Sequence, residues 1–539
     1  MPSVILNKKE VEKILGKKIS LEELKDRISM LGTDLDKIEN DEIHVEIFPN
    51  RPDLMSEQGL GRALSSFLGI KTGLKEYKVK KSGYQLFAKD PEDNWPFVLG
   101  FMVKNLKLNT IKVNELIQLQ EKLNVTFTRN RKKGGIGLYP LDKIKFPVTF
   151  TAKPSTSIKF QPLGFKKELT AKEILEQHPK GKTYGHIVNS WKKLPLFLDS
   201  NQIIMSMPPI INSEIVGKIT ENSKDLFVEA TGPDMNTLRD ALNIIATTLA
   251  DMGGEIYSLE IVYPKKKFDF PTLEPREMKL ELDQVNKYLG LELSEKELKM
   301  YLEQMGYSYN NKLVLIPPYR VDILNQVDLI EDVAISYGYE KFKPTIPQVS
   351  TIGQEDKFEI LKTRIANYLV GFGLLETNSY NLISKEDLKK TLVEIKTIQI
   401  KNPVNLEYNT LRTSIVVSLL KILSENKHNE YPQNLFEIGR VFENDQEYQD
   451  LGLVLCHDKV TFTDAKQIFD SLMNYMELEY SIEEMETPLC ISGRAGQVKV
   501  KGKTIAYIGE INPQVLTNFN LTTPVALIEI KLDELFKVM

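Results

Sequence analysis

The feature that most constrains this chain is a pattern of residues that occurs twice. The matched positions are Leu15, Gly16, Leu24, Gly32, Pro49, Arg51, Asp53 and Gly69 in the first copy, and Leu289, Gly290, Leu298, Gly306, Pro318, Arg320, Asp322 and Gly338 in the second. The spacing between the copies is 274 positions through Gly306 and 269 positions from Pro318 onward, as one shortened loop would produce. Such a repeat indicates two modules of one fold, which we place at residues 1–85 and 277–345.

Length and composition indicate a multidomain globular protein. The chain has 539 residues with a formal net charge of -4, so any contact with nucleic acid depends on local basic patches. Two cysteines are too few for a disulfide scaffold or a cysteine-based zinc site. Charged residues at Lys8, Lys9 and Glu10 interrupt the N-terminus, and no apolar run approaches membrane-spanning length. We therefore expect a cytoplasmic protein without membrane segments.

The remaining chain divides into two larger regions of mixed structure. Residues 90–265 contain many strand-like runs and a long helix expected at residues 236–252, which Gly253-Gly254 would end. Three consecutive lysines at 265–267, among prolines, predict a linker before the second module. Residues 350–539 predict an antiparallel sheet with packed helices. The expected fold class is therefore α+β, with several domains.

Only the second module carries a cluster of carboxylates, formed by Asp322, Asp328, Glu331 and Asp332. The last three follow a helical spacing on the face opposite to Val327, Ile330, Val333, Ala334 and Tyr337. Adjacent like charges destabilise a free helix unless a cation is present, and hard oxygen donors without His or Cys suit Mg²⁺. The alternative is a solvated acidic first turn favoured by the helix dipole. The first module has Gly59, Arg62 and Ala63 at the last three positions, so the fold does not require the acids.

Several motifs together resemble the phenylalanyl-tRNA synthetase β subunits. The signature consists of Tyr319-Arg320-Val321-Asp322-Ile323, Asp328-Leu329-Ile330-Glu331-Asp332-Val333 and Tyr337-Gly338-Tyr339. Further matches are Phe48 to Leu54, His178 to Gly181, Pro208 to Ser213, Leu411 to Ser414, Leu435 to Phe442 and Gly509 to Pro513. The chain is similar to the shorter, archaeal and eukaryotic type, and we expect it to be without the modules that are added in the bacterial subunits.

The resemblance carries expectations about partners, cofactors and fold. In that family the acids matching Asp322, Asp328, Glu331 and Asp332 are assigned to Mg²⁺, in a site shared with the α subunit. The repeated modules would be winged-helix-like, and residues 350–539 would form a class II synthetase core that has lost its active site. ATP would then be bound in the α subunit, within an (αβ)₂ assembly that charges tRNA(Phe). Arg440 could mimic an ATP-gripping arginine, but a structural role is the plainer assignment.

Residues 90–265 resemble the family's editing domain, which hydrolyses tyrosine wrongly attached to tRNA(Phe). An apolar pocket rejects an isostere with one extra hydroxyl by only about 10²-fold, so a second site has a purpose. Candidate pocket residues are Ser213, Glu229, Thr231 and Asp234, with Asn212 and Thr220 nearby. The alternative for Asp234 is that it caps the following helix.

Two other groups of residues allow more than one interpretation. His178 and His186 are interpreted as ordinary surface-loop histidines, because no third ligand accompanies them. The basic run formed by Arg129, Arg131, Lys132 and Lys133 could contact phosphate or could be a solvated loop.

Two alternative functions remain for the whole chain. One is a non-enzymatic assembly or tRNA-binding factor of the same ancestry. The other is a DNA-binding protein with two winged-helix modules, which the acidic character of residues 21–30 argues against.

Overall fold

The computed structural model describes residues 3–539 of the chain. The chain divides into two compact units, Met1–Thr345 and Ile346–Met539, and each is described by itself. Within the described residues, no helix combines the length and apolar character needed to cross a membrane.

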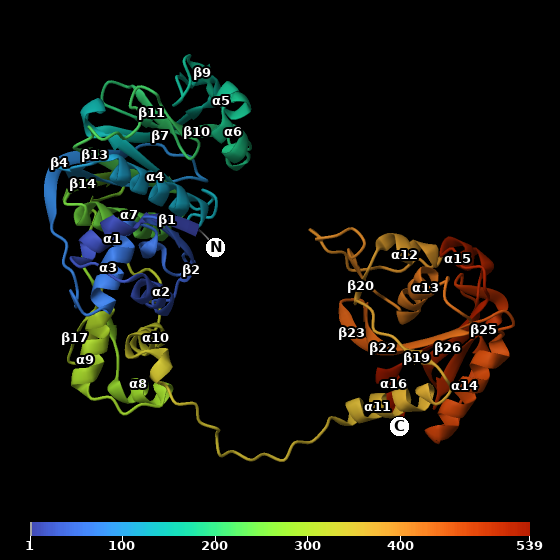
Figure 1. The fold of residues 1–539 in the computed structure, drawn as a ribbon. Coiled ribbons are helices and arrows are strands. Elements are labelled where there is room, and N and C mark those ends of the chain that lie inside the picture. The colour runs from blue at the N-terminus through green and yellow to red at the C-terminus, as the bar shows by residue number, and fades with distance from the viewer. Residues whose placement is uncertain (1–2) are drawn as a thin grey trace. The chain divides into compact units, whose positions relative to one another are not determined.

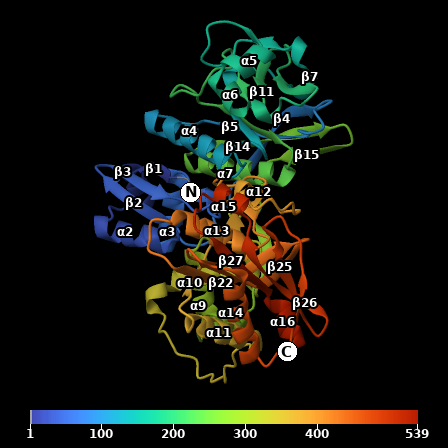
Figure 2. The same ribbon diagram turned by 90° about the vertical axis from the view of Figure 1, so that its right-hand side faces the viewer.

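The two repeated sequences fold into modules with the same order of elements and the same sheet topology (Figures 1 and 2). Each has an antiparallel three-stranded sheet, with strand order β1-β3-β2 in the first and β16-β18-β17 in the second. The first contains β1 (Ser3–Asn7), α1 (Lys8–Leu15), α2 (Leu21–Met30), β2 (Asp34–Glu39), β3 (Glu42–Glu46) and α3 (Glu57–Phe67). The second contains β16 (Arg276–Lys279), α8 (Leu282–Leu289), α9 (Glu295–Gln304), β17 (Ser308–Asn310), β18 (Leu313–Ile316) and α10 (Gln326–Tyr337).

The residues shared by the modules explain their common local structure. Gly16 and Gly290 end the first helices with φ of 75° and 66°, a left-handed conformation that glycine adopts without a Cβ clash. Ser20 and Ser294 accept hydrogen bonds from backbone N–H groups at the start of the second helices. Caps and stops at matched positions therefore fix the same helix lengths in both modules.

The middle domain is built on a ten-stranded sheet, with the main strand order β12-β11-β10-β7-β4-β14-β5-β13-β6. Helices α4 and α7 contact each other, and α7 packs on β5, β13 and β14 (Figure 1). Its strands are β4 (Val79–Ala88), β5 (Phe97–Lys104), β6 (Gly135–Pro140), β7 (Val148–Pro154), β10 (Lys193–Leu198), β11 (Ile204–Met207), β12 (Ile211–Asn212), β13 (Leu226–Gly232), β14 (Glu255–Tyr263) and β15 (Lys266–Phe270). Its helices are α4 (Thr110–Val125), α5 (Ala171–Gln177), α6 (Pro179–Tyr184) and α7 (Met235–Asp251), and β8 (Lys159–Phe160) pairs with β9 (Leu169–Thr170).

Two features of the middle domain differ from the sequence prediction. The lysines at 265–267 do not form a linker, because residues from Lys266 onward form β15 and pair with β14. Strand β4 lies partly before residue 85, yet it pairs with β14 and β7 and so belongs to the middle sheet. Charged side chains on an edge strand face solvent, which is why this lysine-rich strand resembles a linker in the sequence. The predicted long helix is confirmed as α7.

The second unit is a seven-stranded sheet with helices on both faces (Figure 1). Its strand order is β19-β22-β23-β27-β26-β25-β24, antiparallel except for the β19–β22 pair. The strands are β19 (Leu375–Glu376), β22 (Gln433–Glu443), β23 (Gln446–Cys456), β24 (Ser481–Glu484), β25 (Cys490–Val500), β26 (Lys503–Ile511) and β27 (Val525–Lys531), with a small pair of β20 (Leu382–Ile383) and β21 (Thr410–Leu411). The helices are α11 (Lys357–Val370), α12 (Lys385–Lys390), α13 (Ile415–Glu425), α14 (Phe462–Tyr475), α15 (Pro513–Asn518) and α16 (Leu532–Val538).

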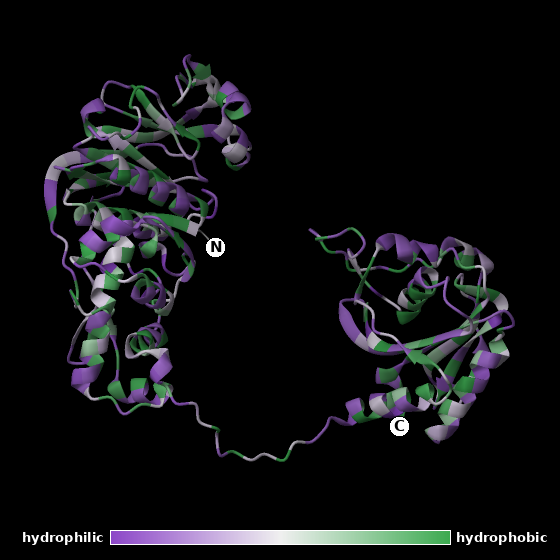
Figure 3. Cartoon of the chain, viewed as in Figure 1, coloured by the Kyte–Doolittle hydropathy of each residue, from purple (hydrophilic) through white to green (hydrophobic). Residues whose placement is uncertain are grey.

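The alternation of side chains along these strands gives the second unit two separate cores. Phe436, Leu453 and Ile528 pack with α11, α14 and α16, whereas Val454 and Leu527 pack with α13. Hydrophobic residues accordingly predominate along the central strands (Figure 3). The predicted antiparallel sheet with packed helices is therefore present.

Candidate functional site

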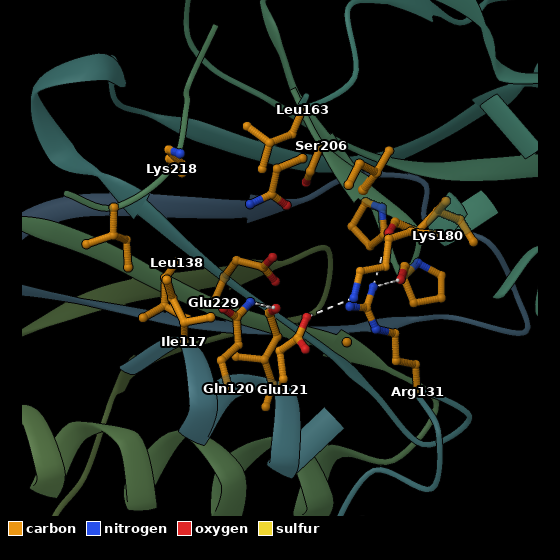
Figure 4. A pocket seen from close by; sticks show the side chains of 18 of the residues that line it. Ile117, Gln120, Glu121, Arg131, Leu138, Leu163, Lys180, Ser206, Lys218 and Glu229 are labelled. Carbon is orange, nitrogen blue, oxygen red and sulfur yellow. Dashed lines mark hydrogen bonds and ion pairs between the residues drawn. The ribbon is translucent and has the colours of Figure 1, made fainter. Parts of the chain in front are cut away.

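A pocket of about 280 Å³ opens in the middle domain (Figure 4). Strands β6, β11, β12 and β13 and helix α4 supply most of its walls. Leu138 and Ile117 form an apolar side, and Arg131 and Lys180 lie on the other side (Figure 4). The remaining lining includes Gln120, Glu121, Ser206, Pro208, Pro209, Asn212 and Glu229. A small cavity with an apolar wall and a few polar groups is typical of a ligand site.

Glu229 is the one charged residue of β13, a strand that is buried along its whole length. The strand pairs with β5 on one side and β6 on the other, so its backbone groups are satisfied in the sheet. A carboxyl group in the middle of such a strand loses its hydration without gaining a cation. Burial accordingly raises the pKa of Glu229 to about 8, although the Tyr139 hydroxyl partly opposes that shift.

The two carboxyl oxygens of Glu229 have different surroundings. Oε1 accepts a hydrogen bond from the Tyr139 hydroxyl at 3.0 Å, and Ser206 Oγ lies 2.9 Å from the same hydroxyl. Oε2 is buried and has no hydrogen-bond partner. With its pKa near 8 the group is mostly protonated at neutral pH, so it can donate to or accept from a ligand hydroxyl.

Glycine residues in β6 leave room for this arrangement. Gly137 pairs with Glu229 across the strands, and a Cβ at that position would lie 2.3 Å from Glu229 Oε1 and 2.6 Å from the Tyr139 hydroxyl. A Cβ at Gly135 would lie 3.0 Å from Pro209. Any larger residue at position 137 would therefore displace the buried carboxyl group.

The rim of the pocket is polar and carries charges of both signs. Lys180 Nζ forms a 2.8 Å ion pair with Glu121. Arg131 donates to the carbonyl oxygens of Pro209 and Ile210 at 2.7 and 3.1 Å, and its guanidinium lies 4.3 Å from the centre of the Tyr184 ring. Arg131 thus fixes the segment that carries Pro208 and Pro209, which makes it more than a solvated loop residue.

Of the four predicted pocket residues, only Glu229 lines the pocket. Thr231 lies two residues along the same strand, buried, with its hydroxyl unpaired. Ser213 is fully buried directly after Asn212, and its hydroxyl accepts from the backbone N–H of Ile215. Asp234 does not line the pocket. Its carboxylate accepts from the N–H groups of residues 236 and 237 at the start of α7, the capping role that was the alternative.

Tyr139 and Ser206 are site residues that the sequence analysis missed. They lie 90 and 23 positions before Glu229, on β6 and β11, so no local motif links them to it. The histidines also differ from expectation in part. His186 is exposed, but His178 is buried, and its ring accepts from the Lys180 N–H as a helix cap.

Two of the four predicted metal-binding acids contact Arg320 in the second module, and the other two do not. Arg320 makes a two-point ion pair with Asp322 at 2.9 and 2.7 Å, and it contacts Asp332 at 2.6 Å. The Tyr307 hydroxyl also donates to Asp332. Asp328 accepts from the N–H groups of residues 324 and 325 and caps α10, while Glu331 is exposed. In the first module Arg51 pairs with Asp53 in the same way.

These contacts do not fit a Mg²⁺ ion held by the four carboxylates of this chain. Mg²⁺ needs oxygen ligands that converge on one point with open coordination positions. Arg320 already neutralises two of the acids, and Asp328 is engaged with backbone N–H groups. Among residues 3–539 the structure gathers no three His, Cys, Asp or Glu side chains as metal ligands. The helical spacing predicted a shared face, but Asp332 turns into the module and is buried.

Comparison with known proteins identifies the family. Residues 1–70 match the model of the Phe-tRNA synthetase beta subunit B1 domain, residues 278–339 the tRNA synthetase B5 domain, and residues 342–532 the phenylalanyl tRNA synthetase beta chain CLM domain. A phenylalanine–tRNA ligase beta subunit from Pyrococcus horikoshii is 38% identical, with 100% of both chains covered. The chain belongs to the phenylalanine–tRNA ligase β-subunit family, archaeal type.

Other β subunits of this ligase agree with that assignment. Those from Thermococcus gammatolerans and Archaeoglobus fulgidus are 39% and 38% identical, and 99% of each chain is covered in both comparisons. The crystal structure of an N-terminal fragment of the Pyrococcus horikoshii phenylalanyl-tRNA synthetase β subunit covers 63% of this chain, with a TM-score of 0.60 and 38% identity. The chain is thus a component of the aminoacyl-tRNA synthetase machinery of protein biosynthesis.

Proposed function

We propose that this β subunit removes tyrosine from wrongly charged tRNA(Phe) in its middle domain, and that it scaffolds an (αβ)₂ ligase. In this assembly the α subunit binds ATP and Mg²⁺ and attaches phenylalanine to tRNA(Phe). The observation that carries the editing proposal is Glu229 Oε2, a buried polar atom without a partner in a pocket of amino-acid size.

The pocket geometry suits the discrimination that editing requires. A tyrosine side chain could place its ring against Leu138 and Ile117 and its hydroxyl at Glu229. Phenylalanine would leave the buried carboxyl group unpaired, and a site built to bind a hydroxyl rejects the analogue that lacks it. Glu229 is thereby proposed as the residue that recognises the phenol.

The hydrolytic step would occur near the polar rim. A tyrosine seated on Glu229 would direct its ester toward the side of the pocket that carries Glu121, Arg131 and Lys180. Water would add to the ester carbonyl carbon, the bond to the ribose oxygen would break, and tyrosine and uncharged tRNA would leave. Arg131 and Lys180 are cations that suit the phosphates of a tRNA 3′ end.

The second unit supports the assignment of aminoacylation to the α subunit. Arg440 is exposed on the β22–β23 hairpin and pairs with Glu447 at 3.1 Å, which agrees with a structural role. Arg412 is fully buried and pairs with Glu437 at 2.7 Å. A Cβ at Gly439 would lie too close to Arg412 Nη2, because the Arg412 side chain already fills the space beside this strand.

The test is release of tyrosine from Tyr-tRNA(Phe) by the chain assembled with its α subunit, with Phe-tRNA(Phe) as the control substrate. We expect Glu229→Leu to lower the preference for Tyr-tRNA(Phe) over Phe-tRNA(Phe) at least about tenfold. A tenfold change corresponds to the free energy of about one hydrogen bond. Phenylalanylation by the same variant should be unchanged, which shows that the assembly is intact. If the wild-type complex charges phenylalanine but leaves tyrosine attached, the middle domain is a scaffold and the alternative of a non-enzymatic assembly factor is correct.

A further inference from the structure

A second cavity, of about 480 Å³, lies where the two repeated modules meet the end of helix α7. Its lining carries six cationic side chains and a single carboxylate, Asp251. The cations are Lys13, Arg51, Arg62, Lys71, Lys75 and Arg320. Acids outside the lining pair with three of these cations: Asp53 with Arg51, Asp322 and Asp332 with Arg320, and Glu10 with Lys13. The cavity is distinct from the pocket at Glu229, and the donors that these pairs leave unused decide what it can bind.

Two arginine side chains that line the cavity have buried N–H donors without hydrogen-bond partners. Arg320 is only 2% exposed, and Asp322 and Asp332 occupy its Nε and Nη2, which leaves Nη1 buried without a partner. Arg62 stacks on the Tyr319 ring at 3.7 Å and uses Nη1 for Asp251, so its Nε and Nη2 are also buried and unpaired. Buried donors without acceptors are costly, and they point to a missing ligand with several acceptor oxygens.

A fourth unpaired donor and a lysine without an ion pair support the same inference. Ser65, on α3, lines the cavity, and its hydroxyl is buried without a hydrogen-bond partner. Asp251 is shared by Arg62 and Lys75, with the lysine at 2.6 Å. Lys71 forms no ion pair within the described part of the chain, residues 3–539. Lys71 is therefore a cation of the lining that no acid of the described residues neutralises.

We propose that this cavity binds a small molecule that carries phosphoryl groups. Arginine forks match phosphate oxygens in geometry and charge, and lysines at the rim add Coulomb attraction. The volume exceeds that of a single phosphate and lies within the range of small-ligand sites. Arg320 is too deeply buried for an RNA backbone to reach, so a free polyphosphate or nucleotide is the occupant that fits.

The probe is pyrophosphate, titrated calorimetrically into the full chain in complex with its α subunit at 0.15 M salt. Lys71→Glu places a negative charge at the exposed rim and should weaken this binding at least about tenfold. Lys78→Glu is the matched control, because Lys78 is also exposed but does not line the cavity. Pyrophosphate bound in the α subunit contributes equally to both variants, so the difference between them reports on this site.

A second variant tests the buried side of the cavity. Ser65→Ala removes an unpaired hydroxyl, so it should leave the unfolding midpoint without ligand unchanged or slightly higher. Its affinity for pyrophosphate should nevertheless fall severalfold. Equal binding by the Lys71 and Lys78 variants would overturn the proposal, as would binding that Ser65→Ala does not alter. Displacement of pyrophosphate by tRNA at this site would assign it to RNA and would also overturn the small-molecule proposal.

Discussion

The hydroxyl of Tyr139 donates a hydrogen bond to Glu229 Oε1 at 3.0 Å, across two neighbouring strands of the middle sheet. This contact fixes the orientation of the carboxyl group and leaves Oε2 as its free atom. A buried carboxyl group that is held by one neutral donor, with no cation beside it, remains protonated at neutral pH. The pair therefore presents a neutral hydrogen-bonding group to the pocket.

Replacing Tyr139 by Phe should impair the site although the ring still occupies the same space. The hydroxyl contacts to Glu229, Ser206 and Asn212 would be lost, at a cost to the free energy of unfolding of about 1–3 kcal/mol. Tyrosine release should fall, because the orientation of Glu229 is no longer fixed. Tyr309→Phe is the control, since it also removes a hydroxyl–carboxylate bond, to Glu295, but lies in the second module. Equal tyrosine release by both variants would contradict the role of Tyr139.

The raised pKa of Glu229 makes stability depend on pH in a defined direction. The folded chain favours the protonated carboxyl group, so this contribution is fully present below pH 4.5 and is lost as the pH rises to about 8. Glu229→Gln removes the titration, and the unfolding midpoint should then fall less between pH 5 and 9. The check is a series of denaturation midpoints for both proteins.

A contrasting control is Glu281→Gln. Two lysines hold the pKa of Glu281 down to about 2, so its contribution is present above pH 4.5 and is lost only as the pH falls toward 2. This variant should retain the wild-type slope between pH 5 and 9. An unchanged slope in Glu229→Gln would mean that the carboxyl group is ionised in the folded chain.

Gly137→Ala should be more harmful than a single methyl group suggests. The added Cβ would meet Glu229 Oε1 at 2.3 Å and the Tyr139 hydroxyl at 2.6 Å, and it would force both apart. Overpacking of this kind costs about 1–3 kcal/mol. We expect both a lower unfolding midpoint and loss of tyrosine release. Gly353→Ala is the control, because a Cβ there meets no atom within 4 Å, and it should change neither property. If Gly137→Ala also changed neither, the backbone of β6 would have to move enough to accommodate the methyl group.

The sequence predicted those features that depend on local chemistry. Gly16 and Gly290 belong to the repeated pattern that predicted the two modules, and each ends its helix by a local backbone conformation. The caps at Ser20 and Ser294 act over the same short range, although the prediction did not include them. The long helix α7 and the antiparallel sheet of the second unit were likewise predictable from periodicity and turn residues.

The features that the sequence did not predict depend on contacts between distant residues. Tyr139 meets Glu229 only because β6 and β13 are neighbours in the sheet. Asp234 carries a local capping signal, and that role excludes it from the pocket. Asp332 has the spacing of a metal ligand, but the burial of Arg320 draws it inward. Periodicity gives the face of a helix, whereas the charge that this face meets is decided by tertiary packing.

Arg320 should be essential to the fold of the second module, and divalent metal should not be. Arg320→Met would leave Asp322 and Asp332 buried without their cation, which costs about 3–5 kcal/mol. Arg440→Met removes an exposed ion pair, with both side chains more than half exposed, and should cost less than about 1 kcal/mol. Addition of a chelator should leave the unfolding midpoint of the wild-type chain unchanged, because the arginine already supplies the positive charge that the acids need. A midpoint that falls with the chelator and recovers with Mg²⁺, together with tolerance of Arg320→Met, would show instead that a metal ion organises the four carboxylates.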